Sequence, residues 1–465
     1  MATYHTSLVW FRNDLRLFDN EAYYKATVSS QFVIPLFCFD EHLFETSSFG
    51  FPRINHHRAT FLYDSVQNVY DQLSVVNSAM VVRKGNPITE IEKILAMFSI
   101  DAIYFTKEHT WEEQQRENQL LLLKAKYPQL QFHSCENTSL LQSEQVPFSL
   151  EQLPNNFTQY FNEVKKVLQF TPIQVLPKPI SKPFPDTATS QMVDIAFPSK
   201  LSIFPSITFP DTIEEPLFEG GEQCGKERVK EYIWKSNAVK VYKETRNGLL
   251  GKNYSSKFSP WLAVGAISAR FIYNEVLRYE EERVANDSTY WLCYELFWRD
   301  YFQLVAKKYG KQIFLPQGIK NKQQPKEWSR KFAQHWIQGT TGIPFIDAAM
   351  RELQQTGFIS NRMRQNVASF LIHDLNIPWL FGAEYFESQL IDYDPASNYC
   401  NWGYIAGVGC DPREVRKFNI LKQAQTYDPY GEFVQFWIPE LRSTNKKTKS
   451  SYPKPIINLK PYVEK

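Results

Sequence analysis

The first 135 residues alternate short apolar runs with longer segments of helical periodicity. The runs S-L-V-W-F, F-V-I-P-L-F-C-F, A-M-V-V-R and A-I-Y-F are rich in β-branched and aromatic residues, whereas residues 58–73 place apolar side chains at helical spacing. Strands that alternate with helices indicate a mostly parallel sheet covered on both faces. No G-x-G-x-x-G follows the first run, so the dinucleotide-binding fingerprint is missing. We therefore expect an α/β domain over residues 1–135.

The pattern changes twice after this domain. Nine of the 27 prolines lie between Thr171 and Pro216 with little periodicity, which indicates an interdomain connector over residues 136–220. From about residue 225 the sequence is helical almost throughout, as in E-R-V-K-E-Y-I-W-K and W-L-C-Y-E-L-F-W-R-D-Y-F. We expect an all-helical domain over residues 221–441 and a separate tail over residues 442–465.

Composition narrows the class of protein. The length of 465 residues favours two domains, and no apolar run is long enough to span a bilayer. Six scattered cysteines without a C-x-x-C pair fit reduced thiols and give no zinc signal. The N-terminus shows neither a signal-peptide nor a transit pattern. We expect a cytoplasmic protein with no membrane partner.

Two features of the composition leave alternatives open. The formal net charge is +2, and residues 442–465 carry seven basic residues and one acid. This tail is either a nucleic-acid contact or a solvated terminus. Aromatic residues reach 15% of the chain, which fits either large cores or stacking on a flat cofactor or on nucleobases.

Polar residues crowd the stretch from Asn361 to Asn419, among neighbours patterned for burial. Buried carboxylates and guanidinium groups are costly unless they are paired or bound to a ligand. The residues concerned are Asn361, Arg362, Arg364, Gln365, Asp392, Asp394 and Asn398. We therefore expect this stretch to surround a large cofactor with polar edges.

The same stretch contains a partial calcium-loop pattern. Asp392, Asp394 and Asn398 have the spacing of calcium ligands, but Ser397 and Gly403 stand where the loop needs Gly and Glu. We expect no metal site here. Helix capping by Asp394 or Ser397 is the alternative structural role.

Two further motifs have competing interpretations. G-G-E-Q-C-G-K lacks the Ser or Thr of a phosphate-binding P-loop, because Glu227 follows it, and a tight turn that opens a helix fits better. In Y-S-S-K-F-S-P, Ser259 before Pro260 is a natural helix N-cap, yet hydroxyls at a helix start also form a phosphate cradle.

Glu295 and Trp298 lie three residues apart on an otherwise apolar helical segment. Glu295 is either a core acid paired with Arg299 or a hydrogen-bonding group on the floor of a pocket whose wall is aromatic.

Several motifs together resemble the cryptochrome/photolyase family, and within it the DASH branch. They are W-F-R-N-D-L-R-L-F-D-N, E-G-G-E-x-x-G-x-x-R-V, Y-S-S-K-F-S-P-W-L-A-V-G-A-I-S, E-L-F-W-R-D-Y-F, T-G-I-P-F-I-D-A-A-M-R-E-L and L-I-D-Y-D-P-A-S-N-Y-C-N-W-G-Y. The resemblance spans nearly the whole chain. It implies a Rossmann-like antenna domain, a helical domain, and a folded-back FAD bound without a covalent link.

The resemblance also implies roles for individual residues. Around the FAD phosphates and ribityl chain it places Tyr242, Ser255, Ser256, Lys257, Phe258 and Ser259. In the flavin cavity it places Glu295, Trp298, Asn361, Arg364, Asp392, Asp394 and Asn398. Arg364 is expected to pair with Asp392, and Asn398 to lie beside the flavin N5, where it tunes the redox form.

A tryptophan relay that reduces the flavin is implied as well. Trp402 and Trp379 match its first two members. The segment before G-T-T-G is two residues shorter than usual, so the third member is Trp328 or Trp336.

A lesion pocket is expected at the mouth of the cavity. Its residues are Glu295, Trp298, Asn361, Arg362, Gln365 and Tyr404, with Arg413 and Arg416 as phosphate contacts. Gln365 and Tyr404 stand where photolyases of cyclobutane pyrimidine dimers carry Met and Trp. A smaller stacking wall favours single-stranded DNA, because flipping a base out of a duplex costs a few kcal/mol.

Two functions follow from the resemblance. The first is light-driven repair of cyclobutane pyrimidine dimers in single-stranded DNA, with Glu295 hydrogen-bonded to the dimer. The second is a blue-light photoreceptor that binds nucleic acid without repair. We expect a monomer. A methenyltetrahydrofolate antenna is expected at Glu108, for which an exposed helical acid is an equal interpretation.

Overall fold

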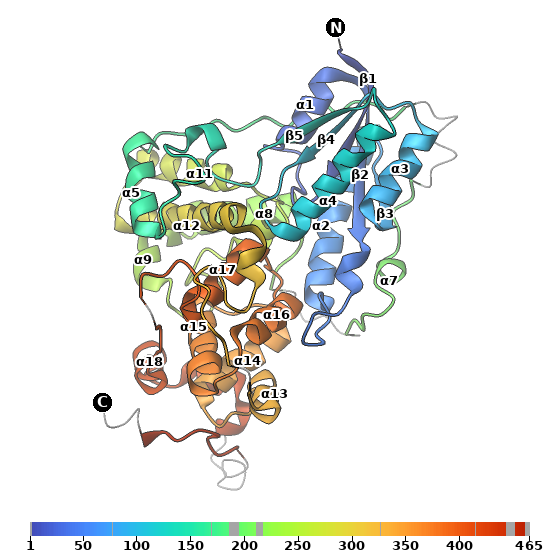
Figure 1. Cartoon of the computed structure of the whole chain (residues 1–465). Coiled ribbons are helices and arrows are strands. Elements are labelled where there is room, and N and C mark those ends of the chain that lie inside the picture. The colour runs from blue at the N-terminus through green and yellow to red at the C-terminus, as the bar shows by residue number, and fades with distance from the viewer. Residues whose placement is uncertain are drawn as a thin grey trace.

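A five-stranded parallel sheet forms the N-terminal part of the structure (Figure 1). The computed structural model describes residues 2–76, 78–168, 170–185, 195–210, 217–325, 327–413, 415–442 and 452–460. The strands are β1 (Tyr4–Phe11), β2 (Ser30–Asp40), β3 (Val81–Gly85), β4 (Ala102–Thr106) and β5 (Gln131–Cys135), in the order β3-β2-β1-β4-β5. The four expected strands are confirmed. The fifth has no apolar run, because this edge strand is largely accessible to solvent.

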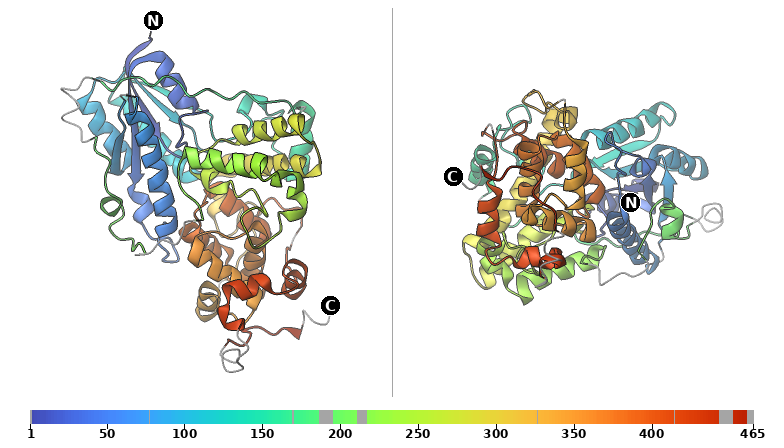
Figure 2. Two further views of the ribbon diagram at one scale, coloured as in Figure 1. Left: turned by 180° about the vertical axis from the view of Figure 1, so that it is seen from behind. Right: turned by 90° about the horizontal axis from the view of Figure 1, so that it is seen from below.

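Both faces of the sheet are covered, as the sequence pattern predicts. Leu8 and Trp10 of β1 pack into one apolar cluster with α3 (Pro87–Met97) and α4 (Trp111–Leu122). Val9 and Phe11 point to the other face and pack with α1 (Glu21–Ser29) and α2 (His56–Ser74). This two-residue alternation is the geometry of a strand buried on both sides. The two views in Figure 2 show the helices around the sheet.

Among the described residues of the segment expected to be a connector are the α-helices α5 (Phe157–Leu168) and α7 (Lys200–Ile203). Phe157 and Phe161 of α5 pack against Tyr294, which lies on α12 (Asp287–Tyr309). The aromatic residues of this segment therefore dock it onto the helical domain.

Residues 217–442, as far as the structure describes them, form helices and turns without strands. The α-helices are α8 (Glu222–Val229), α9 (Tyr242–Thr245), α10 (Ser259–Ala263), α11 (Ala269–Glu282), α12 (Asp287–Tyr309), α13 (Arg330–Gln338), α14 (Pro344–Thr356), α15 (Asn361–Ser369), α16 (Trp379–Gln389), α17 (Pro395–Ala406), α18 (Ile420–Tyr427) and α19 (Glu432–Trp437). The expected α/β-then-helical architecture is confirmed.

Buried polar contacts tie the helical domain to the preceding part of the chain. Arg270 of α11 donates to both carboxylate oxygens of Asp19 at 3.0 and 3.1 Å. The carboxylate of Asp300 on α12 accepts from the backbone N–H groups of Leu140 and Leu141 at 2.8 and 2.9 Å. The first contact ties α11 to the α/β domain, and the second ties α12, which carries Glu295, to the segment that follows β5.

Part of the basic tail folds back onto the helical domain. The hydroxyl of Tyr452 donates to Asp347 on α14, and the backbone N–H of Ile456 donates to the carbonyl of Thr341 at 3.0 Å. Residues 452–460 are therefore docked on the helical domain, with the basic residues Lys454 and Lys460 exposed to solvent. The basic residues between 443 and 450 lie outside the described residues.

Candidate functional site

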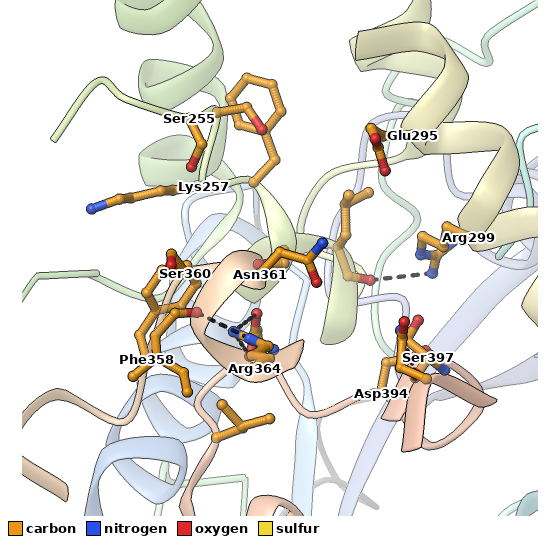
Figure 3. Close-up of a pocket in the computed structure, with 18 of the residues that line it drawn as sticks. Ser255, Lys257, Glu295, Arg299, Phe358, Ser360, Asn361, Arg364, Asp394 and Ser397 are labelled. Carbon is orange, nitrogen blue, oxygen red and sulfur yellow. Dashed lines mark hydrogen bonds and ion pairs between the residues drawn. The ribbon is translucent and has the colours of Figure 1, made fainter. Parts of the chain in front are cut away.

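A cavity of about 300 Å³ lies in the helical domain, between α12, α15 and α17. Its lining includes the expected cofactor residues Tyr242, Ser255, Ser256, Lys257, Phe258, Ser259, Glu295, Asn361, Arg364, Asp392, Asp394 and Asn398, together with Gln365 and Trp402. Figure 3 shows Ser255 and Lys257 on one side and Glu295 and Arg299 on the helix opposite. A pocket of this volume is in the range of ligand sites, about 300–1,000 Å³.

Helix α15 presents three of its polar residues to the cavity. Ser360 caps the helix by accepting from the backbone N–H of Met363 at 3.3 Å. Asn361, Arg364 and Gln365 then line the cavity at helical spacing on one face. The cap and the helical period therefore explain why this cluster is polar although its helix is partly buried.

Arg364 and Asp392 form an ion pair within the lining. Nη2 of Arg364 lies 3.0 and 2.8 Å from the two oxygens of Asp392, and Nε donates to the carbonyl of Ile359 at 3.0 Å. The expected pairing is present. It neutralises a buried carboxylate and fixes the guanidinium at the cavity wall.

Helix α17 and the residue before it bring further polar and aromatic groups to the cavity, among them Asp394, Asn398 and Trp402. Asp394 caps the helix by accepting from the backbone N–H of Ser397 at 2.7 Å, and its other oxygen accepts from Gln303 at 3.1 Å. Capping by Asp394, the alternative to a ligand role, is therefore present, and Asp394 also lines the cavity. Asn398 donates from its amide to the carbonyl of Ala383 at 3.0 Å, which orients the side chain, and Trp402 follows one turn later.

The side chain of Arg228 holds the backbone of the loop before α10. The guanidinium donates to the carbonyls of Ser256 and Ser255 at 3.0 and 3.1 Å. These contacts fix the backbone of the loop where Ser255 and Ser256 line the cavity. Sequence reasoning missed this role, although Arg228 is part of the quoted E-x-x-G-x-x-R-V motif.

Lys257 in this loop adopts the left-handed conformation, with φ of 53°. Its ammonium donates to the carbonyl of Gly251 at 2.9 Å, and burial lowers its pKa to about 8. An anion in the cavity would stabilise the charged form. The expectation that Ser259 caps α10 is wrong, because the helix begins at Ser259 and Phe258 occupies the capping position.

Glu295 pairs with Arg246 rather than with Arg299. The Arg246 guanidinium contacts the Glu295 carboxylate, which also accepts from the indole N–H of Trp291 at 3.2 Å. Arg299 donates instead to the carbonyls of Thr138 and Leu262. Burial raises the pKa of Glu295, and Arg246 opposes this rise.

Arg246 and Asn247 line the cavity but were not expected there. They lie in Y-K-E-T-R-N-G, just after Tyr242, and no periodic pattern distinguishes them from a solvated turn. Asn247 accepts from Arg362 at 3.0 and 3.2 Å. Arg362 therefore lies beside the cavity without lining it, bonded also to Gln365 at 3.1 Å.

Trp298 does not line the cavity, contrary to expectation. Its ring stacks on Phe157 with centroids 3.8 Å apart and planes 10° apart, and it meets Tyr404 edge-on at 6.1 Å. No sequence pattern pointed to Phe157, because residue 157 lies in the segment expected to be a connector.

The remaining lesion-pocket candidates also lie outside the cavity lining. Arg416 covers the ring of Tyr404 at 4.1 Å, donates to its hydroxyl and pairs with Asp411. Arg413 is exposed, and its backbone N–H donates to Asp411 at 3.0 Å. Tyr404 and Arg416 form one cluster next to Trp298.

The tryptophans occupy distinct positions. Trp402 lines the cavity, and Trp379, at the start of α16, donates to the carbonyl of Pro316 at 2.8 Å. Trp336 is fully buried with its ring centroid 6.4 Å from that of Trp402. Trp328 is only partly buried and packs against Phe381 at 5.2 Å.

Glu108 is buried, with 6% of its surface exposed, and lies between β4 and α4. The interpretation as an exposed helical acid is therefore wrong. Its carboxylate contacts Arg12 at 2.8 Å and Asn13 at 2.7 Å, and burial raises its pKa to about 7 against the effect of Arg12. It follows β4 next to β1, where the strand order reverses and α/β folds commonly bind ligands.

Neither a cluster of metal ligands nor a membrane-spanning helix occurs in the described residues. No group of three or more His, Cys, Asp and Glu side chains there could hold a metal ion. No helix in the same residues is long and apolar enough to cross a membrane.

Comparisons with known proteins agree with the fold and the cavity. Residues 7–182 match the family described as DNA photolyase, and residues 291–463 match the FAD binding domain of DNA photolyase. Cryptochrome DASH of Synechocystis sp. is 43% identical over 449 residues, which cover 94% of this chain and 88% of that protein.

Solved structures agree as well. The crystal structure of a Synechocystis cryptochrome matches with a TM-score of 0.91 at 39% identity, covering 100% of this chain and 98% of that chain. An archaeal photolyase from Sulfolobus tokodaii, solved with two FAD molecules, matches with a TM-score of 0.74 at 28% identity, covering 99% and 98%. The fold and the cavity thus define a photolyase-type flavoprotein. The chain belongs to the cryptochrome/photolyase family, in its DASH branch.

Proposed function

We propose that the protein binds FAD in the cavity and repairs cyclobutane pyrimidine dimers in single-stranded DNA under blue light. The observation that carries the proposal is one cavity that joins a phosphate-cradle loop, the Arg364–Asp392 pair and Trp402 to the raised-pKa carboxyl of Glu295. When bound, FAD supplies light-driven one-electron transfer.

The residues present suit FAD. The hydroxyls of Ser255, Ser256 and Ser259 and the ammonium of Lys257 form a donor set for a diphosphate at the start of α10. Apolar side chains such as Phe386, Leu390 and Trp402 supply walls for a flat ring, and Arg364, Asp392 and Asn398 supply polar partners for its edge.

Glu295 would form a hydrogen bond with the pyrimidine dimer. Burial shifts its carboxyl toward the protonated form, which can donate a hydrogen bond to a carbonyl oxygen of the base. Arg246 holds the carboxylate in place in the absence of substrate. A base that entered the cavity would compete with this ion pair.

The preference for single strands rests on the surroundings of the mouth. Phe157 covers one face of Trp298, and Arg416 covers one face of Tyr404, so neither ring offers both faces to a base. Stacking is worth about 1–3 kcal/mol per base, which is comparable with the few kcal/mol that flipping a base out of a duplex costs. A single strand largely avoids this cost. Arg362 and Gln365 at the cavity edge and the exposed Arg413 would contact the strand.

We further propose that Trp402, Trp379 and Trp328 pass electrons from the surface to the cavity. Trp328 suits the outer end because it is partly buried, whereas Trp336 is enclosed beside Trp402. A folate antenna at Glu108 belongs to the same proposal, and a near-ultraviolet absorption band beyond that of free flavin tests it.

The alternative is a photoreceptor without repair. In its favour, the groups at the mouth are bonded to one another, Glu295 to Arg246 and Tyr404 to Arg416. A photoreceptor needs the FAD cavity but no access for a lesion.

Illumination of the purified, reduced protein with dimer-containing oligothymidine tests the choice. We expect loss of dimers from single strands, little loss from duplexes, and slower repair by Glu295→Gln at unchanged FAD content. Asp287→Asn, an exposed acid on the same helix, is the control. Intact dimers in single strands after illumination would refute repair and leave the photoreceptor.

A further inference from the structure

A buried tyrosine–carboxylate pair lies beside Trp379, and none of the roles above uses it. The hydroxyl of Tyr399 on α17 donates to Oε2 of Glu387 on α16 at 3.0 Å. The ring centroids of Tyr399 and Trp379 are 6.2 Å apart, with planes at 81°. Only 7% of Tyr399 and 3% of Glu387 is exposed.

Glu387 is equipped to accept a proton. Burial raises its pKa, while Arg53 and Arg58 oppose the rise and favour the carboxylate. Nη1 of Arg53 lies 3.1 Å from Oε1, so Oε2 is the oxygen that faces the tyrosine. Burial also holds the pKa of Tyr399 well above its usual range, so the phenol keeps its proton until it is oxidised.

Trp379 lacks such a base. Its indole N–H donates to the carbonyl of Pro316 at 2.8 Å, and an amide carbonyl does not take up a proton near neutral pH. An indole that loses an electron at this position therefore stays a cation and a strong oxidant. The nearest hydrogen-bonded phenol is that of Tyr399.

The packing of α16 on α17 connects this pair to the cavity. A Cβ on Gly382 would fall 2.1 Å from Cη2 of Trp402, so the Trp402 ring lies directly against α16, one turn after Trp379. Tyr399 in turn precedes Trp402 by one turn of α17. The three aromatic rings thus lie along one helix–helix contact.

We propose that Tyr399 is a proton-coupled electron donor to oxidised Trp379. The step rests on the proposed function, in which light-excited FAD draws an electron through Trp402 and Trp379. One electron passes from Tyr399 to the Trp379 cation, the phenolic O–H bond breaks, and the proton moves to Oε2 of Glu387. The products are neutral Trp379, a neutral tyrosyl radical and a protonated Glu387.

This step would hold the oxidising equivalent away from the cavity. Return of the electron to the tyrosyl radical requires return of the proton from Glu387 as well, so charge recombination is slowed. Reduced flavin could then accumulate even where the surface end of the tryptophan relay is blocked.

Tyr385 provides a matched control. It is also buried and lies beside a tryptophan, with its ring centroid 5.4 Å from that of Trp336. Its hydroxyl meets the amide nitrogen of Gln354 at 3.3 Å, not a carboxylate. A tyrosine without a base should not donate in this way.

The test is flash photolysis of the FAD-loaded full chain, with electron paramagnetic resonance of the trapped radical. Variants are compared in a Trp328→Phe background, which closes the surface route. We expect a tyrosyl signal whose rise slows in deuterated buffer. Tyr399→Phe should abolish the signal, Glu387→Gln should suppress it, and Tyr385→Phe should leave it unchanged.

The outcomes separate this step from the proposed function. Suppose that Tyr399→Phe still photoreduces the flavin, with the same radical signal and the same decay of the Trp379 cation as in the parent protein. This result would overturn the tyrosine step alone. No flavin photoreduction in the wild type would overturn both the proposed tryptophan relay and the tyrosine step, whereas dimer repair by the reduced protein is decided by its own assay. If Glu387→Gln fails to fold, the solvent isotope effect on the parent protein decides the proton step. Absence of that isotope effect overturns the step.

Discussion

Gly382→Ala should displace the tryptophan that lines the cavity. The added Cβ would lie 2.1 and 2.4 Å from Cη2 and Cζ3 of Trp402, and 2.6 Å from Cδ2 of Leu371. Carbon atoms pack best at about 3.5–4.0 Å. The Trp402 ring must therefore move by more than about 1 Å, or α16 must shift away from α17.

The cost can be bracketed from the structure. Overpacking of a core costs about 1–3 kcal/mol, whereas replacing Gly by Ala inside a helix stabilises it by about 0.5–1 kcal/mol. Gly403 on α17 isolates the second effect, because its nearest contact to an added Cβ is an ordinary 3.6 Å. Gly403→Ala should be neutral to stabilising, and Gly382→Ala should fall about 1–3 kcal/mol below it.

Chemical denaturation of both variants measures the difference in the free energy of unfolding. The rate of flavin photoreduction under continuous blue light reports whether Trp402 has moved. We expect this rate to fall in Gly382→Ala but not in Gly403→Ala. Equal stability and equal photoreduction in the two variants would refute the argument that Gly382 makes room for Trp402.

Three further predictions concern single polar groups. Asn398→Asp places a carboxylate against the carbonyl of Ala383 and should change the stable redox form of the flavin; an unchanged absorption spectrum during stepwise reduction would contradict the tuning role. Burial raises the pKa of Glu352 to about 8, so the folded state binds more protons between about pH 4.5 and 8, and the free energy of unfolding falls as pH rises through this window by at most about 1.4 kcal/mol per unit. Glu352→Gln should flatten this slope in denaturation curves, and a slope equal to that of the wild type would exclude Glu352 as its cause. Tyr452→Phe removes a hydrogen bond to the buried Asp347 and should cost about 1.5–3 kcal/mol; an unchanged melting temperature would show that the tail does not stabilise α14.

The local pattern of apolar and polar residues was sufficient to predict an element wherever a strand or helix period alone decides which side chains are buried. The apolar runs of β1, β2 and β4 were visible because both faces of these strands are buried. In the edge strand β3 the run was visible because Val81 and Val82 are buried, whereas the other edge strand, β5, has no such run. The polar anomaly of residues 361–398 correctly marked a cavity, since α15 and α17 carry their polar residues at helical spacing toward it. The resemblance added the assignment of that cavity to FAD.

Pairing partners could not be predicted in the same way. Glu295 has Arg299 four residues away on its own helix, yet it bonds Arg246, which another element brings closer. No sequence pattern around Glu108 predicts its burial. Glu108 is buried because it follows β4, which lies next to β1 in the sheet, and there it pairs with Arg12. Such contacts depend on side chains that meet only after the chain has folded.

The sequence by itself determined the two kinds of domain, the family and most of the residues around the cavity, because these depend on periodicity and on motifs of adjacent residues. Only the tertiary structure decided that Phe157 covers Trp298, that Trp336 lies beside Trp402, and that Tyr399 meets Glu387. The physical reason is the same in each case. Stacking and hydrogen bonding require distances of a few ångströms between elements far apart in the chain, and no local pattern records them.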